Sequence, residues 1–323
     1  MAKQGNGGRR VTPSANARSR TPRPRPAEAR SATRRPAARR PRRTPARARQ
    51  LRRRRIVFGI LATVVVGLIV TATVPLVHLV SEWNVETRKA SIDLAEFDPG
   101  FLIDDADFYD GNAMDADAIQ RFLDDQIDEC ANDSCLNVLR AELPAREAIV
   151  SKDTGETICE AYDGGELTAA QIIDRVQRAC GISAKVLLVT LQKEQSLVSG
   201  RAARAPSSEA LGAAMGARCP DDAPCDPGRA GFAAQIAQGA TDLKAYRASQ
   251  FMRQPGTHYI AYSPNPDCGG TDIEIRNHAT AALYNYTPYQ PNAAAIAARW
   301  DTGDSCSSYG NRNFALYWKL WFS

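Results

Sequence analysis

Acidic residues are almost absent from the first 55 residues of this 323-residue chain, which contain one acid, Glu28, and 20 Lys and Arg. Large apolar residues are scarce there as well, so the segment has too little apolar surface to offset the entropy lost on folding. The rest of the chain has the opposite imbalance, with 21 basic and 35 acidic residues. The sequence therefore predicts a disordered Arg/Pro-rich tail over residues 1–55, joined to a separate acidic part.

Charged residues are absent from Ile56 to Val80, directly after the tail. In a helix these residues extend about 37 Å, which is enough to cross a bilayer. A cleaved signal peptide has an apolar core of only about 7–15 residues and a small-residue cleavage site, for which Thr71–Thr73 is a poor candidate. Because the basic flank precedes the span, we expect a single-pass membrane protein with a cytoplasmic amino terminus and an extracellular carboxy-terminal domain.

Arginine runs like those of the tail bind nucleic acid or anionic lipid head groups. The low-complexity composition of residues 1–55 favours a cytoplasmic retention tail over a specific nucleic-acid-binding segment. We therefore expect anionic lipid as a partner of the tail and no specific nucleic acid.

Cysteine is absent before residue 130, so all eight cysteines follow the predicted span, on its oxidising side. Eight cysteines allow 105 pairings, and the sequence does not choose among them. The short loops "CANDSC" and "CPDDAPC" favour local bridges, and the remaining cysteines then pair with each other. Four intradomain disulfides are expected on this basis: Cys130–Cys135, Cys219–Cys225, Cys159–Cys180 and Cys268–Cys306.

Histidine is scarce, with His258 and His278 the only two outside the predicted span, and no CxxC pair is present. A zinc site is therefore disfavoured. The stretch "DADFYDG" resembles a calcium loop but has Tyr109 at a ligand position and Ala116 where a bidentate glutamate belongs. The GxSxG, P-loop, GxGxxG and HExxH motifs are missing too. We expect neither a metal nor a cofactor.

After a predicted juxtamembrane stalk over residues 81–100, residues 101–323 read as one mostly α domain. A helix is expected behind an Asp115 cap, and a second helix behind a Thr168–Gln171 capping box, ending at Gly181. The stretch "SAKVLLVTLQKEQSL" then forms the second arm of a helical hairpin. Four further helices are predicted in "GFAAQIAQGATDLKAYR", "NHATAALYNYTPY", "NAAAIAARW" and "NRNFALYWKLWF".

One carboxylate lies at the end of the most apolar of these helices, in "LLVTLQKEQSLVSG". Glu194 shares a helical face with Leu187 and Leu191, and the break at Gly200 opens space beside it. A carboxyl group held in a partly dry cleft keeps its proton more readily, as a glycosidase general acid requires. The structural alternative is an ion pair with Lys193, but adjacent helical residues point about 100° apart, which disfavours it.

Three stretches carry a resemblance to a known family: "FYDGNAMDADAIQRFLDD", "AAQIIDRVQRACGISAKVLLVTLQKEQSLV" and "ATAALYNYTPYQPNAAAIAARWDTGDSCSSYGNRNF". With "LLVTLQKEQ" and "ALYNYTPYQPNAA" as the most specific pieces, residues 100–323 resemble exported Gram-positive bacterial proteins labelled hemagglutinin-like. That family is similar to the lysozyme-like group of goose-type lysozymes and soluble lytic transglycosylases. The resemblance implies a lysozyme-like α-helical domain that acts on peptidoglycan glycan strands.

The resemblance also implies a set of site residues. The catalytic glutamate of that group ends a helix within a Glu-Ser motif, and its counterpart here looks like Glu194, followed by Gln195 and Ser196. The "GFAAQ" and "ALYNY" stretches loosely match two cleft motifs, each with a one-residue offset. Substrate-binding roles are thereby implied for Gln235, Tyr284, Asn285 and Tyr286. For the tyrosines beside Pro288, including Tyr289, cleft and core positions both remain open.

A second carboxylate is not required by this analogy, and Asp221 and Glu209 are the candidates if one takes part. The sequence departs from the family where "SSEALGAAMGARCPDD" and the "GFAAQ" helix have alanines in place of aromatics that would stack on sugar rings. Two functions stay open. One is a membrane-anchored muramidase or lytic transglycosylase; the other is a non-catalytic peptidoglycan-binding or adhesion module on an eroded lysozyme-like fold.

Overall fold

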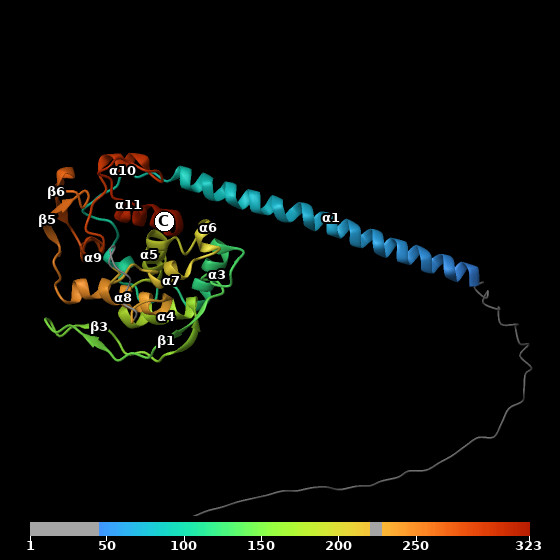
Figure 1. Cartoon of the computed structure of the whole chain (residues 1–323), viewed down its shortest axis with the longest axis horizontal. Helices are drawn as coiled ribbons and strands as arrows, with labels where there is room; N and C mark the ends of the chain where they lie inside the picture. The colour runs from blue at the N-terminus through green and yellow to red at the C-terminus, as the bar shows by residue number, and fades with distance from the viewer. Residues whose placement is uncertain (1–44, 220–227) are drawn as a thin grey trace, which may run out of the picture. The chain divides into compact units, whose positions relative to one another are not determined.

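The computed structural model describes residues 45–219 and 228–323 (Figure 1). By their contacts these residues divide into a unit ending at Val74 and a unit from Pro75 to Ser323. Helices dominate both units, as predicted. Most of the predicted disordered tail lies outside the described residues. Its last part does not fit the prediction, because residues 45–55 are helical. Alanine, leucine, glutamine and arginine are strong helix formers, and Pro45 stands at the first helical position, where proline is tolerated.

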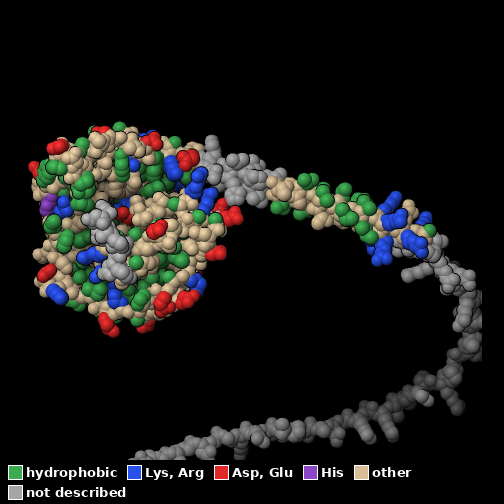
Figure 2. All heavy atoms as spheres, viewed as in Figure 1, with side chains coloured by type: hydrophobic (Ala, Val, Ile, Leu, Met, Phe, Trp, Pro, Cys, Tyr) green, Lys and Arg blue, Asp and Glu red, His purple; other side chains and the backbone are tan. Residues whose placement is uncertain are grey.

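Helix α1, Pro45–Ser91, contains the apolar stretch. Its segment Arg49–Thr71 is long and apolar enough to cross a membrane, with a mean hydropathy of 2.0. The large apolar side chains between Ile56 and Val70 are 47–70% exposed, and Figure 2 shows them along α1 beside a cluster of arginines. The predicted span ran from Ile56 to Val80; the side chains of residues 72–84 are outside those described.

The carboxyl end of α1 and the segment after it pack into the second unit instead of forming a separate stalk. Leu94 is only 2% exposed and clusters with Ala315 and Leu316. The Trp300 indole donates to the carbonyl of Lys89 (3.1 Å), and Lys319 donates to the carbonyl of Asp93 (2.9 Å). Arg299 donates to the carbonyls of Ala90 and Ile92. The predicted stalk over residues 81–100 is therefore wrong in its second half.

Helix α3, Ala116–Ile127, begins behind Asp115, whose carboxylate accepts from the Ala118 amide, as predicted. Helix α4, Ala169–Cys180, begins with the predicted capping box between Thr168 and Gln171 and ends at Gly181 in the left-handed conformation. Helix α5, Ala184–Gln195, is the second arm of the hairpin. The helical period predicts buried faces at Ile119, Phe122, Leu123 and Ile127 and at Ile172, Ile173 and Val176; all are buried except Phe122, which is partly buried.

The later predicted helices are confirmed as α8, α9, α10 and α11, and three short helices accompany them. Their bounds are α2 Asp105–Phe108, α6 Gly200–Ala203, α7 Ser208–Gly212, α8 Phe232–Ala248, α9 His278–Tyr286, α10 Ala293–Ala298 and α11 Gly310–Phe322. Helix α5 lies at the centre, since every residue from Val186 to Leu191 is buried, and it packs against α11 and α4. The domain core is thus built around the most apolar helix of the second unit.

Three two-stranded antiparallel sheets were not predicted. They pair β1 Arg140–Leu143 with β4 Gly165–Thr168, β2 Ile149–Val150 with β3 Thr157–Cys159, and β5 Gly256–Ala261 with β6 Gly270–Ile275. The strands of two to six residues are too short to show a clear alternation of apolar and polar positions. The β5–β6 hairpin nevertheless buries Ile260 and Ile273 against Tyr284.

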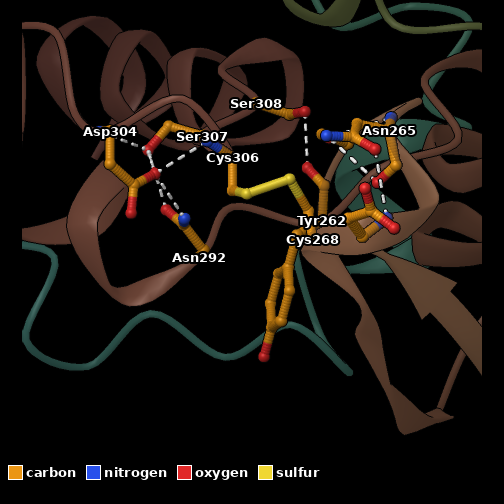
Figure 3. Close-up of a disulfide and its surroundings, with 10 residues drawn as sticks. Tyr262, Asn265, Cys268, Asn292, Asp304, Cys306, Ser307 and Ser308 are labelled. Carbon is orange, nitrogen blue, oxygen red and sulfur yellow. Dashed lines mark hydrogen bonds between the residues drawn. A yellow bond between two sulfur atoms is a disulfide. The ribbon is translucent and has the colours of Figure 1, made fainter.

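Disulfides join the expected partners wherever both cysteines are described: Cys130–Cys135, Cys159–Cys180 and Cys268–Cys306. The predicted Cys219–Cys225 bridge lies partly outside the described residues. Figure 3 shows Cys268–Cys306, which fastens the turn of the β5–β6 hairpin to the segment before α11. Beside it, Asp304 accepts hydrogen bonds from the side chains of Asn292 (2.8 Å) and Ser307 (2.9 Å), and these bonds lower its pKa.

Candidate active site

The carboxyl end of α5 is held firmly by its own backbone and by one amide. Ser196 adopts a left-handed conformation (φ 53°) and donates to the carbonyl of Gln192 (2.9 Å), which ends the helix there instead of at Gly200. The buried Gln192 side chain accepts from the amides of Val198 (3.0 Å) and Ser199 (2.8 Å). Glu194, in the last turn, is thereby carried on rigid backbone.

Glu194 and Lys193 form an ion pair, contrary to the expectation from helical spacing. The Lys193 ammonium contacts Oε1 of Glu194 and donates to the hydroxyl of Thr287 (3.0 Å). It also lies 5.0 Å from the centre of the Tyr286 ring, within the range of a cation–π contact. The Lys193 side chain is 2% exposed and that of Glu194 27% exposed. The two flexible side chains bend toward each other because the buried Lys193 ammonium has almost no contact with water.

A cavity of about 320 Å³ opens beside the Glu194 carboxylate. Gly216 has a φ of 65°, and a Cβ atom there would lie 3.5 Å from Oε2 of Glu194. Because this conformation favours glycine, the backbone approaches the carboxylate without a side chain in between. The cavity is lined by Glu194, Met215, Gly216, Ala217, Arg218, Asp242, Tyr246, Tyr286, Thr287, Pro288 and Tyr289.

Three of these lining residues are tyrosines, so the cavity keeps aromatic surface although the neighbouring sequence is alanine-rich. The Tyr286 hydroxyl donates to the Met215 carbonyl, and burial, followed by the nearby Glu194 charge, raises its pKa well above the ordinary value. Burial, followed by the Asp242 charge, raises the pKa of Tyr246 to about 12. All three rings, including Tyr289, are partly buried. Phenol rings of this kind present apolar faces on which sugar rings stack.

Arg218 and Asp242 form the second ion pair of the cavity. The guanidinium donates through Nε (3.2 Å) and Nη2 (2.9 Å) to the two carboxylate oxygens, in a bidentate arrangement. Gln238 donates to the same carboxylate (2.9 Å). Asp242 is 6% exposed, so its charge is compensated by these partners and not by water.

Gln235 lies beneath the cavity wall and does not line the cavity. Its side-chain oxygen accepts from the amides of Met215 (3.2 Å) and Ala217 (3.1 Å). Its side-chain nitrogen donates to the carbonyls of Ala217 (2.9 Å) and Arg229 (2.9 Å). The side chain is fully buried. Gln235 was expected to contact a sugar. In the structure its side chain instead supports the loop that carries Gly216.

Tyr284 and Asn285 also lie away from the cavity. Tyr284 is fully buried, and its hydroxyl donates to the carbonyl of Pro99 (2.9 Å); burial raises its pKa. The Asn285 side chain is occupied by the backbone of Arg253, with an accepted bond of 3.0 Å and a donated bond of 2.9 Å. Of the five residues expected in the site, Glu194 and Tyr286 alone line the cavity.

The carboxylate beside Glu194 in the cavity is Asp242, which the sequence analysis did not identify. Glu209, one of the expected candidates, is exposed on α7 and outside the cavity lining, and Asp221 lies outside the described residues. A signal for Asp242 exists in the sequence. Gln235, Gln238, Asp242 and Tyr246 recur at intervals of three or four residues, so they share one face of the alanine-rich helix α8.

This chain matches no family model, no curated protein and no solved structure. Within the described ranges, no group of three or more His, Cys, Asp or Glu side chains is placed to hold a metal ion. The side chains that line the cavity include two carboxylates, a guanidinium and three phenols, and the Lys193 ammonium contacts one of the carboxylates. Such a set suits acid–base chemistry on a neutral or acidic polar ligand.

Proposed function

We propose that this protein cleaves the glycan strands of peptidoglycan, as a muramidase or lytic transglycosylase, with Glu194 as the general acid. The observation that carries the proposal is the position of Glu194 on the wall of a 320 Å³ cavity, at the end of a helix whose preceding residues are buried. A general acid has to be held within hydrogen-bond reach of the bond it protonates, and rigid backbone provides this.

The neighbours of Glu194 divide the remaining work. Tyr246, Tyr286 and Tyr289 offer rings on which sugars stack. Lys193 occupies Oε1, so a glycosidic oxygen approaches the carboxyl group at Oε2, beside Gly216. For proton donation the Lys193 ammonium has to shift toward Thr287, its other hydrogen-bond partner. Gln235 supports the loop that forms the opposite wall.

We further propose that α1 anchors the protein in the cell membrane as a single span, with the Arg-rich segment in the cytoplasm and the second unit outside. The support is the apolar segment Arg49–Thr71, the basic residues that precede it and the disulfides of the second unit. Positive flanks stay in the cytoplasm, and disulfides persist in oxidising compartments. Anionic lipid is the proposed partner of the tail.

A second candidate function is non-catalytic binding to peptidoglycan, as in an adhesion module. The Lys193–Glu194 ion pair favours it, because the Lys193 ammonium occupies one oxygen of the carboxyl group that a general acid would use. The engagement of Gln235, Tyr284 and Asn285 with the backbone favours it too. Both candidates share the same cavity and differ in whether a bond is broken.

The test compares the full-length protein in detergent micelles with its Glu194→Gln variant on purified peptidoglycan, with released muropeptides identified by mass spectrometry. Release should fall by about 10²–10⁴ in Glu194→Gln, the usual effect of removing a general acid. Glu209→Gln is the matched control, because Glu209 is exposed and outside the cavity, and it should release muropeptides at the unchanged rate. Wild-type protein that sediments with the wall but releases nothing would instead establish the binding module.

A further inference from the structure

The loop between α7 and α8 holds Arg218 in a strained conformation at the cavity. Arg218 has a φ of 56°, and Gly216, two residues before it, has a φ of 65°. A left-handed conformation is disfavoured for a residue with a side chain, and it persists where the surroundings enforce it. Gln235 enforces it here through its bonds to Met215 and Ala217. Backbone strain is thus used to place this arginine on the cavity wall.

The guanidinium of Arg218 has donors left for a ligand. Of its five N–H groups, Nε and one on Nη2 serve Asp242. Among the residues that the structure describes, the others have no acceptor. The Arg218 side chain is 62% exposed, whereas that of Asp242 is 8% exposed. The ion pair therefore has an inner carboxylate and an outer guanidinium, at the mouth of the cavity.

The other charges of the cavity are less accessible. Glu194 is paired with the buried Lys193, and Asp242 is paired with Arg218 and Gln238. Tyr246 and Tyr286 are neutral phenols, and burial raises their pKa values further above the ordinary value. An incoming ligand accordingly meets Arg218 as the exposed charge. Planar guanidinium groups bind carboxylates with two parallel hydrogen bonds.

We propose that Arg218 forms a carboxylate-binding subsite that recognises the acidic peptide stems of peptidoglycan. The proposal rests on the function proposed above and specifies its substrate: glycan strands that carry stems with free carboxylates, in preference to strands whose charge has been removed. Asp242 offsets the charge of the guanidinium, so it weakens the attraction of a second carboxylate.

Two variants shift this preference in opposite directions. Arg218→Gln removes the guanidinium and should abolish the preference. Asp242→Asn keeps the side-chain shape but removes the competing charge, so the preference should grow. A general loss of folding would lower binding in both variants and would leave the ratio between the two ligands unchanged. Arg218→Lys retains the charge without the planar fork and should retain part of the preference.

Binding is measured at fixed ionic strength with the full-length protein in detergent micelles, on the Glu194→Gln background so that strands are not cleaved. The two probes are soluble stem-bearing glycan strands and the same strands with their carboxylates converted to amides. The unmodified strands should bind about tenfold more tightly, as expected for one charge-assisted pair. Equal affinities, or a preference that survives in Arg218→Gln, would overturn the proposal.

The outcome is separable from that of the proposed function. Cleavage of both kinds of strand at equal rates by the wild type would defeat the subsite and leave the enzyme in place. A carboxylate preference without any cleavage would establish the subsite on a binding module and defeat the enzyme. If Arg218→Gln does not fold, Asp242→Asn decides, because an unchanged or reduced preference in that variant contradicts the proposed role of Arg218.

Discussion

Helices α1 and α5 are both rich in valine, leucine and isoleucine, but their apolar side chains have opposite surroundings. Between Ile56 and Val70 the large apolar side chains of α1 are 47–70% exposed, whereas Val186 to Leu191 of α5 are almost completely buried. Length separates the two: the apolar segment of α1 has 23 residues and the whole of α5 has 12. Apolar side chains are stable where they are removed from water. A long apolar helix is typical of a membrane span, whereas a short one is typical of a helix buried in a protein core.

The neighbouring residues differ in the same way. Arginines precede the apolar part of α1, and the sequence of α1 has no carboxylate before Glu82. Helix α5 has Lys193 and Glu194 in its last turn, next to a cavity. A helix surrounded by protein can carry a charged pair at its end because other elements supply partners, such as Thr287 for Lys193. A helix surrounded by lipid has to leave its charges at the interface.

The largest effect is expected from charges placed in α1. Leu61→Arg combined with Val65→Arg puts two charges on one helical face, at a cost of roughly 5–7 kcal/mol if each costs about 2.5–3.5 kcal/mol in the bilayer centre. The variant should be lost from the membrane fraction after an alkaline carbonate wash. Leu61→Ala with Val65→Ala is the matched control and should stay. Retention of the arginine variant would show that α1 is not surrounded by lipid.

A smaller effect is expected from a cavity in α5. Leu188 is fully buried, and Leu188→Ala should destabilise the second unit by about 2–5 kcal/mol. At about 2–4 °C per kcal/mol for a unit of this size, scanning calorimetry should record a fall in Tm of roughly 4–20 °C. Leu61→Ala, the same change in α1, should leave this transition in place. Equal shifts in the two variants would remove the distinction between the helices.

The smallest effect concerns how the α4–α5 hairpin is held. Thr168 caps α4, and Thr168→Ala should cost about 0.5–2 kcal/mol. Ser183 precedes α5 without capping it, and its buried hydroxyl has no partner among the described residues. Ser183→Ala should therefore leave stability unchanged or raise it slightly. Urea unfolding of the two variants checks this; a loss at Ser183 as large as that at Thr168 would mean that capping, not burial, holds α5.

The helices of the second unit were predictable because their signals are local. The caps at Asp115 and Thr168 and the stop at Gly181 each depend on side chains within four residues. The small sheets were not predictable from the sequence. Strands β1 and β4 pair over only four residues each, and the pairing joins Arg140 to Thr168, which are far apart in the sequence. Likewise, nothing near Leu94 in the sequence indicates its partners Ala315 and Leu316.

The candidate site was predictable on one side. The helical period placed Glu194 at the end of a buried helix, but the opposite wall comes from Gly216 and from Tyr286 to Tyr289, and their approach is a tertiary contact. Gln235 illustrates the limit. A buried glutamine that supports a loop and one that binds sugar have the same sequence signal, and the four backbone hydrogen bonds distinguish them. Lys193 contacts its neighbour Glu194, although adjacent helical side chains point in different directions, because the Lys193 side chain is buried.

The contacts at the end of α1 also set an order of events during synthesis of the chain. The backbone around Lys89 and Asp93 is bound by Trp300 and Lys319, more than 200 residues further along the chain. A chain that leaves the ribosome amino-terminus first exposes the earlier segment long before its partners emerge. Closure of the domain around Leu94 thus has to wait until Leu316 and Lys319 have been synthesised. Until then the buried surface of α5 lacks α11, and this interval is when the emerging chain is most open to aggregation or proteolysis.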